Sequence, residues 1–367
     1  MPRHCDPASI LPSLPSGARI LVVRLRSIGD IVLLTPALRL LKEWRSDLRI
    51  SVVVESRFRE LLENNPDVDE ILDPGHGARW TKIASRAGAV REIRRRGFSL
   101  CINLHGGPTS SLLTAWSGAR WKAGFEHFRR RGIYQILIPD AREILNKPFI
   151  HTAEHQASAF FHLGLPRKEI PPARIEVTAA ETAWWKGERR KLGLPAEGDY
   201  AVLHPTALYA TKQWAPENFA RLGKHLEHEL GLPVIYSCGP GEAGVLDAVE
   251  KCAVAPLRRL SAPGLRQFAA ALAAARIFIG NDSGPAHMAA ALGRPGVVIF
   301  GSSSSRIWGP WPPASLWRVV QNDYDCNPCP GDRCYRFERP ECILSITYEQ
   351  VRSAVERVLA PSAQKLP

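Results

Sequence analysis

The sequence predicts an α/β fold built from two doubly wound domains. Short apolar runs of the kind found in buried parallel strands alternate with helical stretches along almost the whole chain. Polar, glycine-containing turns follow several of these runs, at the sheet edge where such folds bind ligands. At 367 residues the chain is long enough for two hydrophobic cores of ordinary size.

The domain boundaries follow from composition. Residues 1–18 hold several prolines and no continuous apolar run, so we expect a loose N-terminal arm and not a signal peptide. Residues 19–166 form the first domain and 167–178 a linker, which contains Pro171 and Pro172. Residues 179–346 form the second domain, with a cysteine-rich loop at 326–342, and 347–367 a C-terminal helix and tail. No run approaches the ~20 apolar residues of a membrane span, and we expect a cytoplasmic protein.

Each element of the first domain is predicted from a local pattern. The apolar runs predict strands at 19–24, 50–54, 68–72, 100–104 and 121–125, and the stretches between them predict helices at 30–44, 58–64, 87–96, 110–117 and 154–163. Pro36 lies inside the first of these helices, which suggests a restart with Thr35 as its cap. Gly164 and Pro166 end the last one.

The second domain repeats this alternation. Strands are predicted at 200–204, 233–237, 277–279, 297–300 and 317–320, and helices at 179–192, 216–230, 243–252, 265–275, 286–292 and 347–359. Gly231 stops the second helix, and Thr347 and Gln350 have the spacing of a capping box at the start of the last. Two α/β sets of similar size predict two doubly wound sheets with a cleft between them.

The turn after the strand at 277–279 is a candidate anion-binding site. Asp282, Ser283 and Gly284 lie where the chain passes into a helix that has Pro285 in its first turn. Free backbone N–H groups and the positive end of the helix dipole suit a phosphate or diphosphate there. His287 lies one helical turn further on and can face the same spot. The pattern also fits a simple helix cap with a packed histidine.

Two more turns of the second domain carry suitable side chains. Thr206 and Lys212 follow the strand at 200–204, and Glu242 follows the next strand. Lys212 could neutralise a diphosphate, and Glu242 could accept hydrogen bonds from ribose hydroxyls. Neither domain has a Gly-x-Gly-x-x-Gly fingerprint after a strand or a Walker loop, which argues against a nicotinamide enzyme and a P-loop protein.

The positive charge is concentrated in the first half. The net charge is +12, and residues 1–175 hold 27 Lys and Arg against 17 Asp and Glu, while the remaining 192 hold 21 against 19. The basic residues include Arg91, Arg94, Arg95, Arg96 and the run 129–131. Such a surface suits acidic lipid head groups, phosphorylated sugars or nucleic acid, but also an ordinary solvated face.

Three segments resemble glycosyltransferase family 9, the ADP-heptose:lipopolysaccharide heptosyltransferases. They are 281–295 (NDSGPAHMAAALGRP), 306–312 ending in WGPWP, and 24–38 (RLRSIGDIVLLTPAL). The resemblance implies a GT-B architecture with an acceptor domain followed by a nucleotide-sugar domain. It implies inverting transfer of heptose from an ADP-sugar to a lipid-linked or phosphorylated sugar acceptor of the lipopolysaccharide core, with no metal in catalysis. The resemblance implies a peripheral protein at the anionic inner face of the cytoplasmic membrane, and no nucleic-acid partner is expected.

The resemblance also assigns roles to individual residues. Asp30 matches the family's catalytic aspartate. On the local sequence alone, Asp30 could equally be a simple helix N-cap after Gly29. The donor-side positions of the family match Thr206, Lys212, Glu242, Asp282, Ser283, Gly284 and His287. The segment from His204 to Lys212 is one residue longer than the family pattern, which weakens the match of Thr206. His105, at a neighbouring strand end, is the next candidate for the base.

Four cysteines form a cluster near the C-terminus. Cys326, Cys329, Cys334 and Cys342 lie within 17 residues and have the ligand count of a structural zinc or iron site. Free thiols are the alternative, since the spacing is not that of a standard zinc finger and a cytoplasmic setting disfavours disulfides. Related family members carry similar cysteines near this place.

Two other functions remain open on the sequence. The same family includes enzymes that glycosylate proteins, and the cysteine cluster keeps that alternative in view. A nucleic-acid-binding module using the basic half is the second, although no paired aromatic and basic strand motif supports it.

Overall fold

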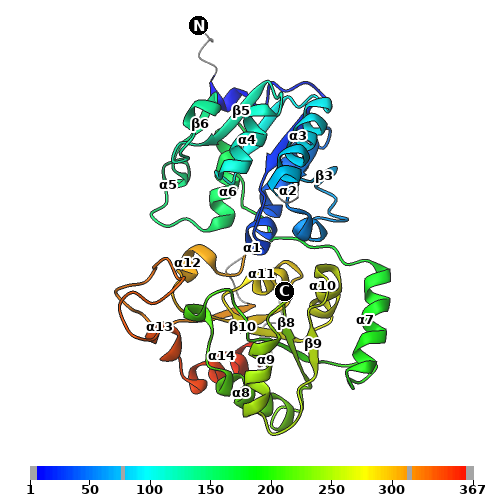
Figure 1. Ribbon diagram of the computed structural model, residues 1–367, viewed down its shortest axis with the longest axis vertical. Coiled ribbons are helices and arrows are strands. Elements are labelled where there is room, and N and C mark those ends of the chain that lie inside the picture. Colours follow the sequence, from blue (N-terminus) through cyan, green and yellow to red (C-terminus); the bar gives the residue numbers. More distant parts are fainter. Residues whose placement is uncertain (1–5, 76–78, 312–315, 361–367) are drawn as a thin grey trace, which may run out of the picture. The chain divides into compact units, whose positions relative to one another are not determined.

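The computed structural model describes residues 6–75, 79–311 and 316–360, with the backbone alone at 79–84. Three predicted parts lie outside these residues: the outer part of the expected arm, Pro312 at the end of the 306–312 motif, and the C-terminal tail. Contacts divide the chain into two units, Met1–Glu176 and Val177–Pro367. Each unit is an α/β structure around its own parallel sheet (Figure 1).

The first unit contains a six-stranded sheet. Its strands are β1 (Arg19–Val23), β2 (Arg49–Val53), β3 (Glu70–Leu72), β4 (Leu100–Asn103), β5 (Trp121–Phe125) and β6 (Ile136–Ile138), all parallel, in the order β3-β2-β1-β4-β5-β6. Ile20 lies opposite Ile50 on one side and Leu100 on the other. After Arg19, every residue of β1 is buried, as expected for a strand covered on both faces.

Helices cover this sheet on both faces. They are α1 (Ile28–Val32), α2 (Thr35–Trp44), α3 (Arg79–Arg95), α4 (Pro108–Trp116), α5 (Ala141–Leu145) and α6 (Thr152–His162), with 3-10 turns η1 (Pro7–Ser9), η2 (Ser56–Leu61) and η3 (Arg131–Ile133). Ile93 of α3 and Leu113 of α4 share a core cluster with Leu21 and Val23 of β1. The helix α2 packs against α6.

Four local predictions for this unit were wrong. The restart expected near Pro36 is present, since α1 ends at Val32 and α2 begins at Thr35, but Thr35 is the first residue of α2 and not its cap. The segment expected as a helix at 58–64 is the 3-10 turn η2, and the basic helix α3 begins at Arg79. The described part of the arm is not loose: Ile10 and Leu11 are fully buried, and the Leu11 amide donates to the Leu163 carbonyl at 2.9 Å.

The second unit contains a sheet with the same topology. Its strands are β7 (Ala201–His204), β8 (Val234–Cys238), β9 (Arg259–Ser261), β10 (Ile277–Asn281), β11 (Gly296–Ile299) and β12 (Trp317–Val320), all parallel, in the order β12-β11-β10-β7-β8-β9. Counted from the first strand of each unit, both orders are the dinucleotide-binding order 3-2-1-4-5-6. The predicted pair of doubly wound sheets is therefore confirmed.

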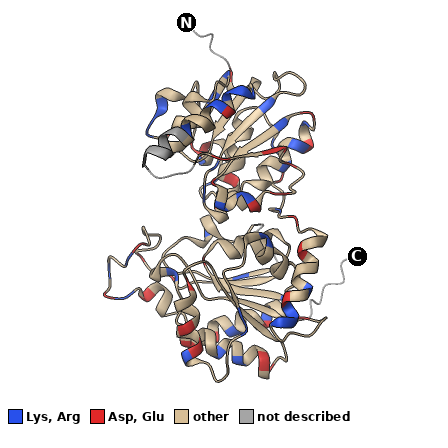
Figure 2. Ribbon diagram, turned by 45° about the vertical axis from the view of Figure 1, so that its right-hand side comes forward, with Lys and Arg blue, Asp and Glu red and all other residues tan. Residues whose placement is uncertain are grey.

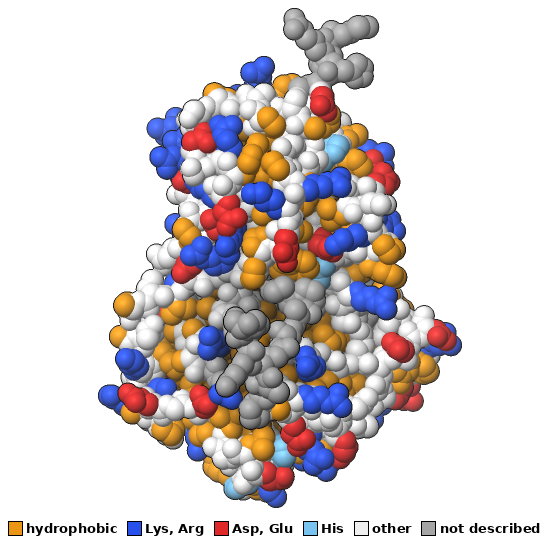
Figure 3. Space-filling model, turned by 180° about the vertical axis from the view of Figure 1, so that it is seen from behind, with side chains coloured by type: hydrophobic (Ala, Val, Ile, Leu, Met, Phe, Trp, Pro, Cys, Tyr) orange, Lys and Arg blue, Asp and Glu red, His pale blue; other side chains and the backbone are white. Residues whose placement is uncertain are grey.

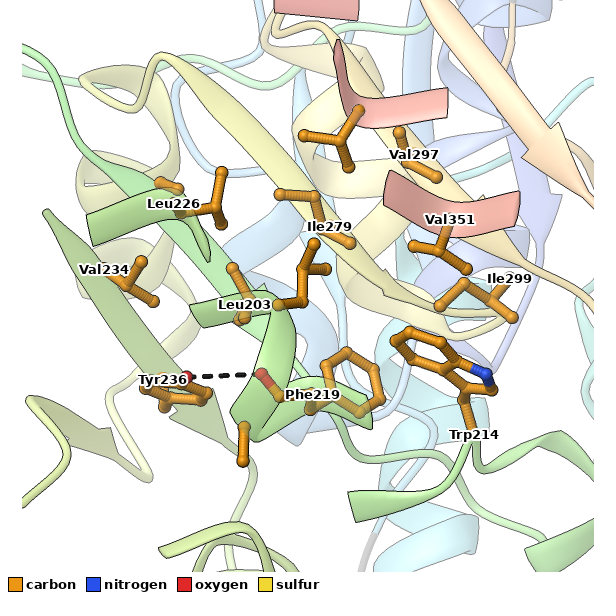
Figure 4. Packing of buried hydrophobic residues seen from close by; sticks show 14 of the residues in the cluster. Leu203, Trp214, Phe219, Leu226, Val234, Tyr236, Ile279, Val297, Ile299 and Val351 are labelled. Atoms are coloured by element: carbon orange, nitrogen blue, oxygen red, sulfur yellow. Dashed lines mark hydrogen bonds between the residues drawn. The ribbon is translucent and has the colours of Figure 1, made fainter. Parts of the chain in front are cut away.

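The core of this unit lies between the sheet and its helices. These are α7 (Ala179–Lys191), α8 (Pro216–His228), α9 (Ala243–Cys252), α10 (Leu265–Ala273), α11 (Gly284–Ala291), α12 (Ser305–Trp308), α13 (Glu341–Leu344) and α14 (Tyr348–Leu359), with the 3-10 turn η4 (Ala210–Lys212). Phe219 of α8 and Val351 of α14 pack on Leu203 and Ile279 of the sheet (Figure 4). The C-terminal helix is thus part of this core.

Among the described residues, no helix is both long enough and apolar enough to cross a membrane.

Candidate active site

The strand order reverses once in each sheet, and several of the predicted site residues follow the strands at these reversals: Asp30 follows β1, Thr206 and Lys212 follow β7, and Asp282 follows β10. In the first unit the neighbours are β1 and β4, and in the second β7 and β10. The connections that follow such a pair run to opposite faces of the sheet and leave a crevice beyond the carboxyl ends of the strands. Asp30 lies in α1, the helix that follows β1, and His105 lies in the turn that follows β4.

Asp30 is anchored from two sides. Ser27 is the N-cap of α1 and Asp30 its third residue, so the helix starts with a capping box. The Ser27 amide and hydroxyl donate to Asp30 Oδ2 at 3.0 and 3.2 Å. Arg24 Nη2 donates to Asp30 Oδ1, and Arg24 Nη1 to the carbonyl of Leu104 beyond β4. The alternative in which Asp30 is itself the N-cap is therefore wrong. The carboxylate keeps 15% of its surface exposed, which leaves room for a hydroxyl to approach.

A cavity of about 640 Å³ lies at the same edge of the first sheet. Its lining includes His105 and three arginines, Arg26, Arg57 and Arg86, from three different segments. Arg86 Nη2 donates to Thr109 Oγ1 at 2.9 Å, and Arg57 pairs with Glu55 at 2.8 Å.

Burial, followed by the charges of Arg24 and Arg26, lowers the pKa of His105, so its ring is neutral at pH 7. The positive charge in the cavity therefore comes from its arginines, which suit a ligand with a carboxylate or phosphate. The sequence analysis missed these three arginines, because nothing in their spacing shows that they converge.

In the second unit, Lys212 and Asp282 are brought together from η4 and the end of β10. Lys212 Nζ donates to Asp282 Oδ2 at 2.7 Å, and the hydroxyl of Ser303 donates to the same oxygen. The Asp282 side chain is 6% exposed, whereas that of Lys212 is 23% exposed. Asp282 thus holds the lysine in place, and the lysine is the more accessible partner for an incoming anion.

Glu242 and Thr206 belong to a second polar chain. Thr206 Oγ1 donates to Glu242 Oε2 at 2.7 Å, and the Gly239 amide donates to the same oxygen at 2.8 Å. Thr206 Oγ1 lies 2.8 Å from His204 Nε2, and His204 Nδ1 lies 2.9 Å from the Ser237 hydroxyl. Because Thr206 donates to Glu242, its oxygen accepts from Nε2, and Nδ1 accepts from Ser237. Complete burial lowers the pKa of His204 and keeps it neutral.

The turn into α11 follows directly after Asp282. Ser283 is the N-cap, with its hydroxyl donating to the Asn281 carbonyl at 3.2 Å, and Gly284 begins the helix. Asn281 donates to the Pro205 carbonyl at 2.8 Å and so ties the β10 turn to the β7 turn. The first amides of a helix lack intrahelical partners and attract anions. His287 is buried within α11.

The four clustered cysteines border one small cavity of about 40 Å³, together with Thr211 and Ser302. Cys342 is buried, and burial together with the other three thiols raises its pKa to about 11. Within the described ranges, no three His, Cys, Asp or Glu side chains are arranged to hold a metal ion. The sulfurs thus share a cavity without forming a closed ligand set.

The cysteine loop is tied to the segments that hold the Lys212–Asp282 pair. The Cys329 amide donates to the Ser302 carbonyl at 3.0 Å, and the hydroxyl of Thr211 donates to the carbonyl of Gly331. Ser302 precedes Ser303, and Thr211 precedes Lys212. The loop therefore holds the residues next to Lys212 and Ser303, the two side chains that donate to Asp282. The contact between Thr211 and Gly331 could not be predicted, since it joins residues 120 positions apart in the sequence.

The family model described as glycosyltransferase family 9 (heptosyltransferase) matches residues 86–336, well over half of the chain. The chain belongs to glycosyltransferase family 9. It is therefore a glycosyltransferase, as the three motifs implied. It is similar to lipopolysaccharide heptosyltransferase 3 of Escherichia coli K12, with 27% identity over 350 residues that cover 92% of this chain and 98% of the relative.

Solved structures confirm the GT-B fold of this family 9 enzyme. A family 9 glycosyltransferase from Veillonella parvula DSM 2008 has a TM-score of 0.82 at 23% identity, covering 94% of this chain and 98% of that one. An E. coli heptosyltransferase with ADP-2-deoxy-2-fluoro heptose has a TM-score of 0.65 at 19% identity, covering 92% and 99%. The iron-containing dodecameric glycosyltransferase TibC from enterotoxigenic E. coli H10407 has a TM-score of 0.58 at 15% identity, covering 95% and 80%.

Proposed function

We propose that this family 9 enzyme transfers heptose from ADP-heptose to an anionic sugar acceptor of the lipopolysaccharide core, with inversion and without a catalytic metal. The observation that carries the proposal is the pair of polar sites at the two strand-order reversals: a carboxylate beside a cationic cavity in one unit, and an anion-binding turn with a lysine in the other. The names of the relatives support the choice of heptose and lipopolysaccharide.

The second unit would hold the donor. Its diphosphate would meet the first amides of α11 and Lys212, which turns from Asp282 toward the new anion. Glu242 would accept from a ribose hydroxyl through Oε1, since Oε2 already accepts from Thr206 and Gly239. These contacts stabilise the negative charge that grows on the diphosphate as it leaves.

The first unit would hold the acceptor and the base. The acceptor hydroxyl oxygen forms a bond to C1 of the sugar, while the bond from C1 to the diphosphate breaks and its electron pair leaves with ADP. The hydroxyl proton passes to Asp30, whose position is fixed by Arg24 and Ser27. Attack on the face opposite the leaving group inverts the configuration at C1.

The cationic cavity favours an anionic glycolipid over a protein as the acceptor. Three arginines converge in it, and arginine pairs bidentately with carboxylate and phosphate. We expect turnover of ADP-heptose with a phosphorylated, Kdo-containing core acceptor and none with a peptide. Transfer to a peptide but not to the core acceptor would favour the protein-modifying branch of the family.

We also propose a structural zinc or iron at the cysteine loop. Four thiols that border one cavity supply the right donor set, and the similar fold of an iron-containing glycosyltransferase supports it. The sulfurs would have to move closer together on binding. Elemental analysis of protein purified without chelator should find about one metal per chain, and four freely titratable thiols with no metal would refute the site.

A further inference from the structure

A groove of about 720 Å³ lies between α3 and α4 in the first unit. Figure 1 labels both helices in this unit. The groove is lined by Arg86, Ala87, Val90, Arg91, Arg94, Arg95, Leu112 and Trp116. Trp116 is 59% exposed and Leu112 37% exposed, and they lie one helical turn apart on the same face of α4. Large apolar side chains gathered at one exposed place mark an interaction surface.

The polar lining of this groove has a single sign of charge. It contains four arginines and no Asp or Glu. Arg91, Arg94 and Arg95 are exposed and make no ion pair with a described carboxylate, since Glu92 pairs with Arg96 at 2.7 Å. Elsewhere Lys and Arg positions lie among Asp and Glu positions (Figure 2), and both signs alternate over the opposite side of the molecule (Figure 3).

We propose that the α3–α4 groove docks the enzyme on a bilayer rich in anionic lipids. The guanidinium groups would bind the phosphates of the head groups, and Trp116 and Leu112 would enter the interface between head groups and acyl chains. Tryptophan favours this interface because its ring is apolar while its N–H still finds a polar partner. A purely electrostatic partner would leave the two apolar side chains in water.

The groove adjoins the acceptor cavity. Arg86 lines both, and its Nη2 donates to Thr109 on the cavity side. Docking through the groove would therefore bring the cavity against the membrane surface, where a lipid-linked acceptor presents its sugars. Only this consequence rests on the proposed function, because docking itself is measured without donor or acceptor.

The test compares two triple variants of the full chain in vesicle co-sedimentation. Arg91→Gln/Arg94→Gln/Arg95→Gln empties the groove of three charges. Lys186→Gln/Arg190→Gln/Lys224→Gln removes three exposed charges from the second unit and gives the same net charge. With phosphatidylglycerol-containing vesicles at low salt, the groove triple should lower the partition coefficient on the order of 100-fold, at about fivefold per charge. The second-unit triple should change it little.

The apolar half of the proposal has its own readout. Trp116→Gln should weaken vesicle binding, and Trp116→Phe should restore most of it. Brominated lipids should quench the wild-type tryptophan fluorescence, and Trp116→Phe should lose that quenching. All variants should keep the thermal unfolding midpoint and the ADP affinity of the wild type, which shows that they are folded.

Several results would overturn the proposal. Equal losses in both triples would mean that net charge alone drives binding. Double-stranded DNA bound as tightly as the vesicles, and lost in the groove triple, would make the groove a nucleic-acid surface. A concentration-dependent dimer that dissociates in Trp116→Gln would assign the groove to a second copy of the chain.

Discussion

At the residue scale, Asp30 combines a structural role with the proposed chemical one. Asp30→Asn keeps the size of the side chain but cannot take the acceptor proton, so turnover should fall by ~10²–10⁴ while the Kd of ADP-heptose stays constant. Steady-state kinetics and calorimetry measure the two effects. Ser27→Ala removes the helix cap and one of the contacts that fix Asp30, at a cost of about 1 kcal/mol of stability, so turnover should fall far less than in Asp30→Asn. Full activity in Asp30→Asn would direct attention to His105.

Lys212 and Asp282 form a pair whose members can be separated by a double-mutant cycle. Lys212→Ala should weaken ADP binding by roughly 1.5–3 kcal/mol, the range for a charge-assisted hydrogen bond. If Asp282 acts only by holding the lysine, Asp282→Asn should weaken ADP binding less, and the double variant should bind no worse than Lys212→Ala. A double variant that binds more weakly than either single one would show that Asp282 contacts the donor itself. Isothermal titration with ADP decides between these outcomes.

At the element scale, the cysteine loop supports the donor side through Thr211 and Ser302. Cys329→Ser should therefore lower both the metal content and the affinity for ADP, because the loop that steadies Lys212 and Ser303 loosens. Cys252→Ser is the control, since Cys252 is an exposed thiol outside the loop. Metal analysis and ADP titration of both variants test this. Loss of metal with unchanged ADP affinity would confine the metal to local stability.

Elements were predictable where the pattern was long and wrong where it was short. The strands β1, β4 and β10 were expected within one or two residues, because buried parallel strands appear as unbroken apolar runs. The three-residue edge strands β6 and β9 were not predicted, since so few residues show no period. The break between α1 and α2 was placed near Pro36, but the box formed by Ser27 and Asp30 was missed.

At the scale of the whole molecule, local motifs identified the family and indicated the turn that is proposed to bind the donor, but not the partners that fix each side chain. Arg24 and Asp30 lie in one motif and could have been paired from it. Lys212 and Asp282 are 70 residues apart, and the arginines of the cavity in the first unit come from three separate segments. Such contacts arise from the strand order, which the alternation of strands and helices does not determine.

Neutral histidines that are partly or fully buried make the stability of the whole chain depend on pH. Burial lowers the pKa of His105, His162 and His204, and lowers that of His155 to about 4. Unfolding raises each toward about 6.5, so the unfolded chain binds more protons in this window and the free energy of unfolding falls as pH falls from about 7 to 5. Each histidine contributes at most about 1.4 kcal/mol per pH unit to the slope of the unfolding free energy. Burial raises the pKa of Asp67, so this group makes the free energy of unfolding rise as the pH falls, at lower pH than the histidines.

His155 offers a direct check of this pH dependence, because its ring stacks on Phe125 with the centroids 4.1 Å apart. His155→Phe keeps an aromatic ring in that place and removes the titrating group. Urea unfolding at pH 7, 6 and 5 gives the free energy of unfolding at each pH. Its slope with pH should be smaller in the variant, by an amount that corresponds to at most one bound proton. An unchanged slope would mean that the pKa of His155 is the same in the folded and unfolded chain, since a group that binds equally many protons in both states contributes nothing to the difference.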